Sequence, residues 1–310
     1  MPEDRLVIFA DPSIAFSRVL FAAFLDELKS REDIQAVAVC DTSRKQARPL
    51  IDWLRHTVQL VFNPSMRGDS TPPFDRTLCR VIAPPKHNVN HPGVMALLRD
   101  DLRPTLALCV GCVQIWKPPL LGAFEMAVNY HDGDLPFYKG LGATAWSLYH
   151  REAHSGYTYH VMENGIDSGP LLLQYRVPIG QATTLRQLRA EKTKLAAADA
   201  KRVLDSMAAR AAGTAQAGAG SYFSSTDRLR ICTIANPVEL TAEEIQHRLY
   251  CFQSLYLPIG GRMREVTELI EATSRDAITT KDGVKLTARR LRWMPPWLYR
   301  VTELIAAESQ

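Results

Sequence analysis

The first third of the chain alternates short apolar runs with a segment in which apolar side chains recur at helical spacing. Residues 6–10 and 34–40 are apolar runs typical of buried strands, and residues 15–28 between them carry the helical spacing. A strand, a helix and a second strand in this order predict a right-handed parallel unit. The first run is not followed by Gly-x-Gly-x-x-Gly, which disfavours dinucleotide binding.

The same kind of pattern continues to about residue 178. Residues 43–77 are the hardest to interpret: 49–60 are compatible with a helix, and 63–73 are rich in Pro, Ser and Gly. The segments that follow predict strands at 79–83, 105–110, 126–130, 157–162 and 171–177, and helices at 93–99 and 144–149.

The last part of the chain has a different pattern. Residues 184–210 predict one long amphipathic helix with Thr184 as its N-cap, and the small, Gly-rich residues 211–220 predict a linker. Thr241 and Glu244 match a capping box that opens a helix to about residue 252. The alternating runs after this linker predict strands at 229–234, 263–269, 277–279 and 284–292.

Together these elements predict an α/β protein. We expect a Rossmann-like, mostly parallel sheet over residues 1–183, the long helix and linker over 184–220, and a smaller β-rich domain over 221–310. The composition, with 310 residues, 46% hydrophobic and 23% charged, is that of an ordinary soluble protein. No run reaches 18 apolar residues and the N-terminus lacks a signal-peptide pattern, so we expect a cytoplasmic protein without a membrane span.

Cysteines and basic residues each raise one alternative. Cys109 and Cys112 form a C-x-x-C pair, but a zinc site needs further ligands at similar spacing, so packing at a strand end is favoured over a metal. The net charge of +4 permits an anionic partner without requiring one. A solvated strand is likewise favoured over a nucleic-acid contact for the basic, aromatic stretch that contains Arg289, Arg290, Arg292, Trp293, Trp297 and Tyr299.

Candidate chemistry is concentrated in three motifs. Asn129-Tyr130-His131 lies at the end of a predicted strand, where residues two apart project from the same face. Leu135-Pro136-Phe137-Tyr138-Lys139-Gly140 follows, and Gly165-Ile166-Asp167-Ser168-Gly169 forms a loop in which glycines let a carboxylate turn inward. An amide, an imidazole and a carboxylate are the minimum set for attack of an amine on an activated formyl group.

These motifs, in this order and spacing over roughly residues 106–178, resemble the 10-formyltetrahydrofolate-dependent formyltransferase family, which includes methionyl-tRNA and sugar N-formyltransferases. The resemblance implies that residues 1–183 are the catalytic domain and that no metal is required. It implies that Asn129 and His131 stabilise the oxyanion and that Asp167 holds His131 charged or relays the amine proton. It also implies folate-binding segments formed by Val113, Gln114, Ile115 and Trp116 and by Glu163, Asn164, Gly165 and Ile166.

One departure bears on the acceptor. Many family members have His-Pro-Ser-Leu-Leu-Pro where this chain has Asp132 and Asp134 after His131. We expect at least one of these carboxylates to face a protonated amine and to repel RNA phosphates. A small metabolite, amino sugar or carrier-bound amine is therefore the expected acceptor. Methionyl-initiator tRNA is the alternative within the class, and hydrolysis of formyltetrahydrofolate by water is the alternative outside it.

Overall fold

We analysed a computed structural model that describes residues 3–43, 80–272, 274, 276–294 and 296–308. The chain forms two compact units. One is drawn from the first 136 residues, Gly156–Arg176 and Arg189–Gly220; the other contains Phe137–Ser155, Val177–Leu188 and Ser221–Gln310. The domain boundaries expected at residues 183 and 220 remain a prediction. The helix considered for 49–60 and the loop for 63–73 lie outside the described residues.

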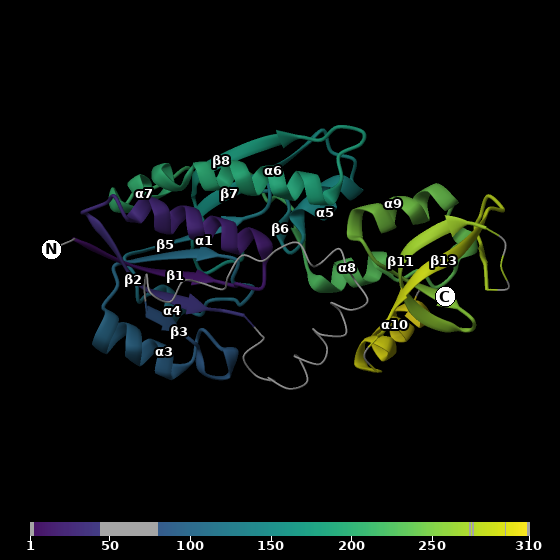
Figure 1. Cartoon of the computed structure of the whole chain (residues 1–310), viewed down its shortest axis with the longest axis horizontal. Coiled ribbons are helices and arrows are strands. Elements are labelled where there is room, and N and C mark those ends of the chain that lie inside the picture. Colours follow the sequence, from purple (N-terminus) through teal and green to yellow (C-terminus); the bar gives the residue numbers. More distant parts are fainter. Residues whose placement is uncertain (1–2, 44–79, 273, 275, 295, 309–310) are drawn as a thin grey trace. The chain divides into compact units, whose positions relative to one another are not determined.

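A seven-stranded sheet organises the first unit, with the strand order β3-β2-β1-β4-β5-β7-β8 among the described residues (Figure 1). The first five strands in this order are parallel to one another, whereas β7 is antiparallel to β5. This mostly parallel sheet confirms the predicted fold class. Its strands are β1 (Asp4–Ala10), β2 (Ile34–Asp41), β3 (Arg80–Ile82), β4 (Leu106–Val110), β5 (Met126–His131), β7 (His154–Val161) and β8 (Leu171–Pro178).

Helices cover both faces of this sheet, as Figure 1 shows. Side chains alternate along β1: Leu6 and Ile8 join the core beneath α1 and α7, whereas Val7 and Phe9 join the core beneath α3 and α4. Because both faces are covered, the central strands are apolar throughout, which explains their continuous hydrophobic runs. The helical segments are α1 (Ala15–Leu28), α3 (Pro92–Leu97), α4 (Pro118–Leu121), α6 (Leu185–Ala198) and α7 (Ala200–Ala208), with short turns at Pro85–His87 (η3) and Leu98–Leu102 (η4).

The prediction of one continuous helix over 184–210 is wrong, because the segment forms two helices, α6 and α7. Thr184 does cap α6, because its hydroxyl accepts from the Gln187 backbone N–H at 3.2 Å. The chain then leaves the helix at Asp199 before α7 begins. The Asp199 carboxylate accepts a 2.6 Å hydrogen bond from the Tyr157 hydroxyl on β7, which ties the break to the sheet. Tertiary contacts therefore divide a segment whose composition alone favours one helix.

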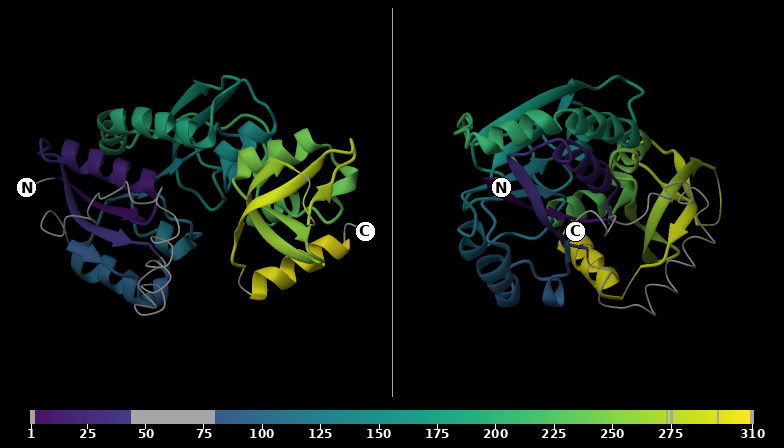
Figure 2. Two further views of the ribbon diagram at one scale, coloured as in Figure 1. Left: turned by 45° about the vertical axis from the view of Figure 1, so that its right-hand side comes forward. Right: turned by 60° about the vertical axis from the view of Figure 1, so that its left-hand side comes forward.

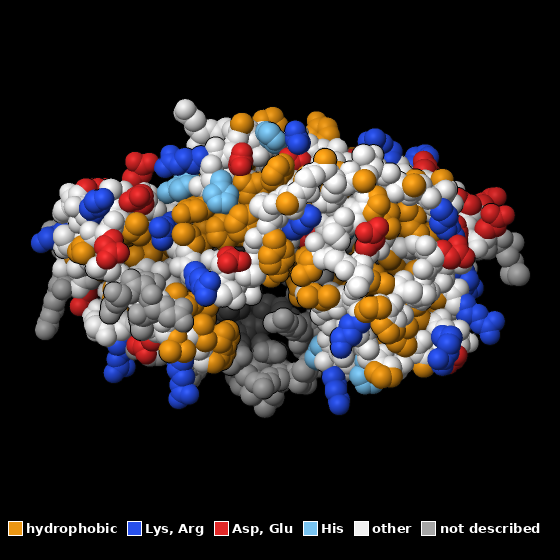
Figure 3. Space-filling model, turned by 180° about the vertical axis from the view of Figure 1, so that it is seen from behind, with side chains coloured by type: hydrophobic (Ala, Val, Ile, Leu, Met, Phe, Trp, Pro, Cys, Tyr) orange, Lys and Arg blue, Asp and Glu red, His pale blue; other side chains and the backbone are white. Residues whose placement is uncertain are grey.

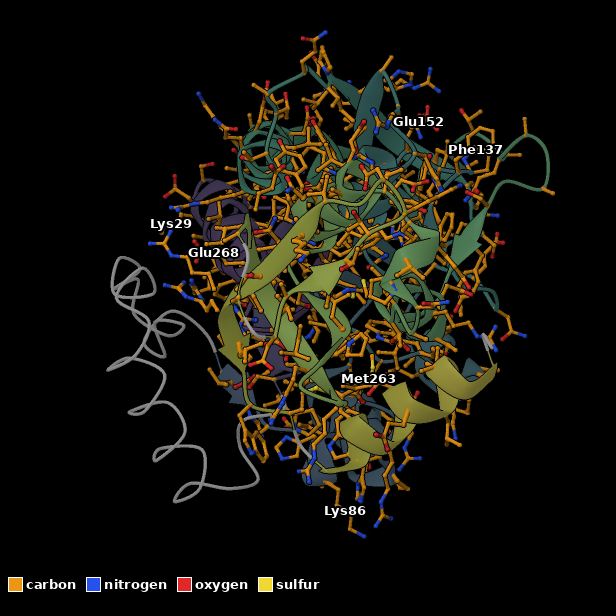
Figure 4. All side chains as sticks on the ribbon, turned by 90° about the vertical axis from the view of Figure 1, so that its right-hand side faces the viewer. Lys29, Lys86, Phe137, Glu152, Met263 and Glu268 are labelled. Atoms are coloured by element: carbon orange, nitrogen blue, oxygen red, sulfur yellow. The ribbon has the colours of Figure 1, made fainter. Side chains whose placement is uncertain are left out.

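The second unit contains a four-stranded antiparallel sheet in the order β10-β11-β13-β12, as expected for the C-terminal part. In Figure 4, Met263 and Glu268 both belong to β11: Met263 is buried, whereas Glu268 reaches Arg289 on β13 at 3.3 Å. The strands of the four-stranded sheet are β10 (Leu255–Ile259), β11 (Arg262–Glu271), β12 (Ile278–Thr279) and β13 (Lys285–Arg292). Two further strands of this unit, β6 (Lys139–Gly140) and β9 (Tyr222–Phe223), pair with each other in a separate sheet.

This unit contains several differences from the sequence predictions. The strand expected at 229–234 is wrong, because Ser224 and Asp227 form a capping box that opens a helix there. The predicted capping box of Thr241 is confirmed. Strand β10 and helix α10 were not predicted, and α10 packs against β11, as the views in Figure 2 show. The helical segments are α5 (Ala143–Tyr149), α8 (Ser225–Cys232), η5 (Pro237–Glu239), α9 (Ala242–Phe252) and α10 (Pro296–Glu308).

Candidate active site

Strand β5 delivers Asn129 and His131 to the carboxyl end of the parallel strands, where ligands bind in open α/β sheets. The intervening Tyr130 points to the opposite face and lies in the core with α1 and α7. Asn129 is partly exposed, whereas His131 is only 6% exposed. In the antiparallel pairing with β7, Asn129 lies opposite His160 and His131 lies opposite Thr158.

Asp167 comes from the loop between β7 and β8 and has a left-handed backbone, with φ of 50°. The loop passes very close to β7, since a Cβ added to Gly169 would lie 1.9 Å from the Val161 carbonyl oxygen. Only glycine fits there. The Gln216 side chain holds the loop from the other side, with its Nε2 donating to the carbonyls of Asp167 at 2.8 Å and Gly169 at 2.9 Å. Gln216 lies in the predicted linker, and no sequence motif identified it.

The three predicted catalytic side chains lie together. The Nδ1 atom of His131 is 3.3 Å from Oδ2 of Asp167, and the Nδ2 atom of Asn129 is 3.4 Å from Oδ1 of the same carboxylate. Both distances are slightly longer than those of strong hydrogen bonds. The side chains of His131 and Asp167 are 7% and 12% exposed, so little water screens their interaction. The carboxylate thus lies between the imidazole and the amide.

His160 is a fourth member of this cluster and was expected only to be a core or surface residue. Its Nε2 atom lies 3.1 Å from Nδ2 of Asn129 and 3.4 Å from Oδ1 of Asp167, and its Nδ1 atom lies 2.9 Å from the Val161 carbonyl oxygen. It is 2% exposed. The available signal was the period of two along the predicted strand at 157–162, which puts His160 on the face of Thr158. The pairing that brings it opposite Asn129 is not contained in that pattern.

Asp132 and Asp134 do not present uncompensated carboxylates. Asp132 forms a 2.7 Å ion pair with the buried Lys192, and Asp134, itself 7% exposed, accepts from Arg176 at 2.9 Å. The expectation that at least one of them faces the acceptor stays a prediction, and each carboxylate has a cation beside it. An adjacent cation cancels most of the field of each carboxylate at a distance.

The first predicted folate-binding segment follows β4 and presents two exposed apolar side chains, Val113 at 52% and Ile115 at 68%. The side chain of Gln114 accepts a 3.1 Å hydrogen bond from the backbone N–H of Val89, so it orders the segment. Trp116 differs from the expected pocket wall: it is 5% exposed and packs on Phe9 with ring centroids 4.3 Å apart. Within the described structure it supports the segment from the core.

The second predicted folate-binding segment leads into the Asp167 loop. Glu163 and Gly165 form an isolated backbone bridge, while Asn164 is exposed and Ile166 is 41% exposed. An exposed apolar side chain next to the catalytic cluster is suited to contact a planar ring. The role of both segments in binding folate remains a prediction.

The part of the chain that contains this site also matches known proteins. A family model described as formyl transferase matches residues 18–203, which is more than half of the sequence. The chain belongs to the formyl transferase family. The resemblance inferred from the three motifs is thus confirmed at the level of the family.

Two relatives of this chain illustrate the range of named proteins. It is 34% identical over 100 residues to the methionyl-tRNA formyltransferase of Trichodesmium erythraeum, covering 31% of this chain and 29% of the relative. It is 31% identical over 97 residues to the GDP-perosamine N-formyltransferase of Brucella melitensis, and the match covers 31% of this chain and 38% of that relative. The chain thus spans less than two fifths of the length of each of these two relatives.

Solved structures share the fold over nearly the whole chain. A 4-N formyltransferase from Francisella tularensis matches with a TM-score of 0.61 and 15% identity, covering 95% of this chain and 100% of that one. An N-formyltransferase from Helicobacter canadensis, in complex with folinic acid and dTDP-3-aminofucose, matches with a TM-score of 0.55 and 17% identity, covering 94% and 100%. At these identities the likeness concerns the fold.

The C-x-x-C pair formed by Cys109 and Cys112 lies where β4 ends. Cys109 is 1% exposed, and Cys40 on β2 is fully buried. The neighbouring Cys112 thiol and burial hold the pKa of Cys109 well above its ordinary value, and the negative charge of Asp167 adds to the effect. Asn129 lies opposite Cys109 in the pairing of β4 with β5, and its amide is 3.4 Å from Asp167, so the Asp167 loop lies near the end of β4. Within the described part of the chain, no group of three His, Cys, Asp or Glu side chains is arranged to hold a metal ion.

The basic C-terminal stretch forms β13 and the start of α10. Arg289 pairs with Glu268 at 3.3 Å and Arg292 lies 3.8 Å from Glu265, while Trp293 and Trp297 are 71% and 65% exposed. On the face of the molecule in Figure 3, lysine and arginine side chains are dispersed among acidic and apolar ones. Among the described residues, no helix is both long and apolar enough to cross a membrane.

Proposed function

We propose that this formyl transferase moves a formyl group from 10-formyltetrahydrofolate to the primary amine of a small acceptor, with an amino sugar or another metabolite amine as the leading class and a carrier-bound amine as a variant. The observation that carries this proposal is the convergence of Asn129, His131 and Asp167 within 3.4 Å at the end of β5. This is the set that polarises a carbonyl and accepts a proton from the attacking amine.

The roles follow from the geometry. The amine nitrogen attacks the formyl carbon, and charge develops on the formyl oxygen. The His131 imidazole stabilises this charge by donating a hydrogen bond, and the Asn129 amide does so by turning one N–H from its long 3.4 Å contact with Asp167 toward the oxygen. The Asp167 carboxylate, 3.3 Å from His131, favours the charged imidazole and receives the amine proton directly or through water. The bond between the formyl carbon and N10 of the folate then breaks, and N10 takes up the proton of the His131 imidazolium as it leaves. The proton that Asp167 received from the amine then returns to His131.

Separate observations bear on the choice of acceptor. Similarity to the GDP-perosamine N-formyltransferase supports an amino sugar, and the ion pairs of Arg289 and Arg292 with glutamates support a solvated β13. Methionyl-initiator tRNA is the second candidate. It is supported by similarity to the methionyl-tRNA formyltransferase and by the exposed Trp293 and Trp297, which are suited to stack on bases.

The deciding experiment is product analysis. Purified protein is incubated with 10-formyltetrahydrofolate and, separately, nucleotide-linked amino sugars, free amino acids, methionyl-initiator tRNA or no acceptor, and formylated products are measured by mass spectrometry. Formylation of an amino sugar above all others supports the proposal. Efficient formylation of the tRNA at physiological salt would show that methionyl-initiator tRNA, and not a small amine, is the acceptor. Formate release that no amine accelerates would indicate a hydrolase. A parallel reaction with a metal chelator tests whether turnover needs a metal ion, and we expect the turnover to be unchanged.

His131→Ala separates the chemistry from folding. We expect turnover to fall by about 10²–10⁴-fold, since a positioned acid or base contributes that much. His154→Ala on β7 serves as a matched control and is expected to keep turnover within about twofold of the unmodified protein. Near-normal turnover of folded His131→Ala would remove His131 from the mechanism.

A further inference from the structure

Lys192 is the one fully buried lysine among the residues that the structure describes, with 0% of its side chain exposed. It lies in the middle of α6, and its ammonium group is surrounded by acceptors. The Nζ atom is 2.7 Å from Oδ1 of Asp132, 3.1 Å from the backbone oxygen of Asp132 and 3.0 Å from the backbone oxygen of Gly156. These three acceptors match the three donors of an ammonium group.

The position of these acceptors is informative. Asp132 directly follows His131 where β5 ends, and Gly156 lies near the start of β7, the strand that pairs with β5. Gly156 is also tightly packed, since a Cβ there would lie 3.0 Å from Cβ of Asp134. Lys192 therefore fastens the turn that begins at His131 to the neighbouring strand, and it uses both the side chain and the backbone of Asp132.

Stability alone is a poor explanation for this arrangement. Burial lowers the pKa of Lys192, so removal of the ammonium group from water is unfavourable, although the Asp132 carboxylate opposes the effect. Well-packed apolar residues in place of a buried ion pair are often as stable or more stable. What an apolar residue cannot supply is a directed bond to the backbone oxygen of Asp132.

We propose that Lys192 and Asp132 are positioning residues for His131: the buried pair fixes the turn after β5, so that the imidazole stays in line with Asp167. This inference rests on the proposed function only for its kinetic consequence. Asp132 is one of the residues at which this chain departs from the family pattern, and Lys192 on α6 is its ion-pair partner. The Asp132 carboxylate thus acts inside the protein rather than on the acceptor.

The test uses the full chain with Lys192→Met, which keeps the length of the side chain and removes its charge. We expect kcat to fall about 10- to 100-fold, the scale expected when a catalytic group is displaced by about 1 Å. The affinity for folinic acid, measured by fluorescence quenching, is expected to stay within about threefold, since the pair lies outside the predicted folate-binding segments. Lys194→Met, on the exposed side of the same helix, is the matched control.

A second variant covers the case in which Lys192→Met fails to fold. Asp132→Asn leaves Lys192 its two backbone acceptors, and we expect a smaller fall in kcat in the same direction. The double variant is expected to be no worse than Lys192→Met, because both changes break one interaction. Folded single variants with unchanged kcat would overturn the proposal, as would equal losses of kcat and folinic acid affinity, which would indicate general loosening.

An NMR measurement separates this inference from the proposed function. The imidazole resonances of His131, assigned by their loss in His131→Gln, are expected to move in Lys192→Met and Asp132→Asn and to stay in place in Lys194→Met. If the unmodified protein formylates no amine, the proposed function fails, and these resonances alone decide whether the pair positions His131. Unmoved resonances in both folded variants would then overturn the positioning role.

Discussion

The Nε2 atom of His160 lies 3.1 Å from the Nδ2 atom of Asn129, across the antiparallel pair β5 and β7. The other ring nitrogen of His160 lies 2.9 Å from the Val161 carbonyl oxygen, to which it can only donate. A ring that carries its proton on Nδ1 can accept at Nε2 from the Asn129 amide, and Nε2 also lies 3.4 Å from Oδ1 of Asp167. His160 is therefore in position to orient the amide that is proposed to stabilise the oxyanion.

We therefore predict that His160→Phe, which keeps a ring and removes both nitrogens, lowers kcat by up to about tenfold. One lost hydrogen bond costs about 0.5–1.5 kcal/mol, and roughly 1.4 kcal/mol corresponds to tenfold in rate. Steady-state kinetics and the folinic acid affinity are the measurements, and the affinity is expected to change little. His154→Phe at the start of the same strand is the control. Turnover equal to that of the control would show that Asn129 needs no support from His160.

This site also shows what the sequence can and cannot predict. Asn129 and His131 were found because a period of two and a strand end are local features. Asp167 was found because its Gly-flanked loop matches a motif of the family that the sequence resembles; the loop alone would indicate an ordinary turn residue. His160 was missed because its neighbour Asn129 is 31 positions away, and only the register of β5 against β7 brings the two together. The contacts that decide the site are thus the long-range ones.

The same division holds for the fold. Helix α1 and the strands around it follow from apolar periodicity, whereas the break at Asp199 depends on the distant Tyr157. In the C-terminal part, the apolar character of residues 229–234 suggested a strand, yet the capping box of Ser224 and Asp227 begins a helix just before them. Local start signals there outweighed the hydrophobic run. The pairing of Asp132 with Lys192 likewise needed the structure.

Asp167→Asn tests the charge rather than the shape of the carboxylate. The amide keeps its size and can still accept from Asn129, but it no longer favours the charged form of His131 or receives the amine proton. We expect kcat to fall by about 10²–10⁴-fold with folinic acid affinity within about threefold. Asp205→Asn, at an exposed ion pair on α7, is the control. A variant with more than a tenth of normal kcat would argue against a catalytic carboxylate at this position.

Gln216→Ala tests whether the linker holds the Asp167 loop in place. The side chain donates to the backbone oxygens of Asp167 and Gly169, so its removal frees a loop whose central residue has a left-handed backbone. Two lost hydrogen bonds correspond to about 1–3 kcal/mol of unfolding free energy. We expect a lower urea midpoint together with a lower kcat. Gln35→Ala is the control, because Gln35 is an exposed residue of β2. A loss of stability without any change in kcat would limit Gln216 to a structural role.

The last prediction concerns pH and the ion pair between Asp4 and Arg210, which joins the start of β1 to the end of α7. The Arg210 guanidinium lies 2.5 Å from Oδ1 of Asp4, and this hydrogen bond holds the pKa of Asp4 below its ordinary value. A carboxyl with a lowered pKa in the folded state stabilises that state above its unfolded pKa, about 3.9, and the contribution is lost as pH falls through the folded value. Asp4→Asn should therefore cost about 1–3 kcal/mol at pH 7, as expected for a hydrogen bond to a charged group.

The difference between Asp4→Asn and the unmodified protein should narrow as pH falls below about 4, because protonation then removes the same charge from Asp4. Urea unfolding at pH 7, 5, 4 and 3 measures this difference. Asp26→Asn is the control, because the pair of Asp26 with Lys29 is 80% and 61% exposed and an exposed pair contributes about 0–1 kcal/mol. A difference that stays constant down to pH 3 would mean that Asp4 acts through packing, since a purely structural effect of the substitution has no reason to follow the titration of the carboxyl group.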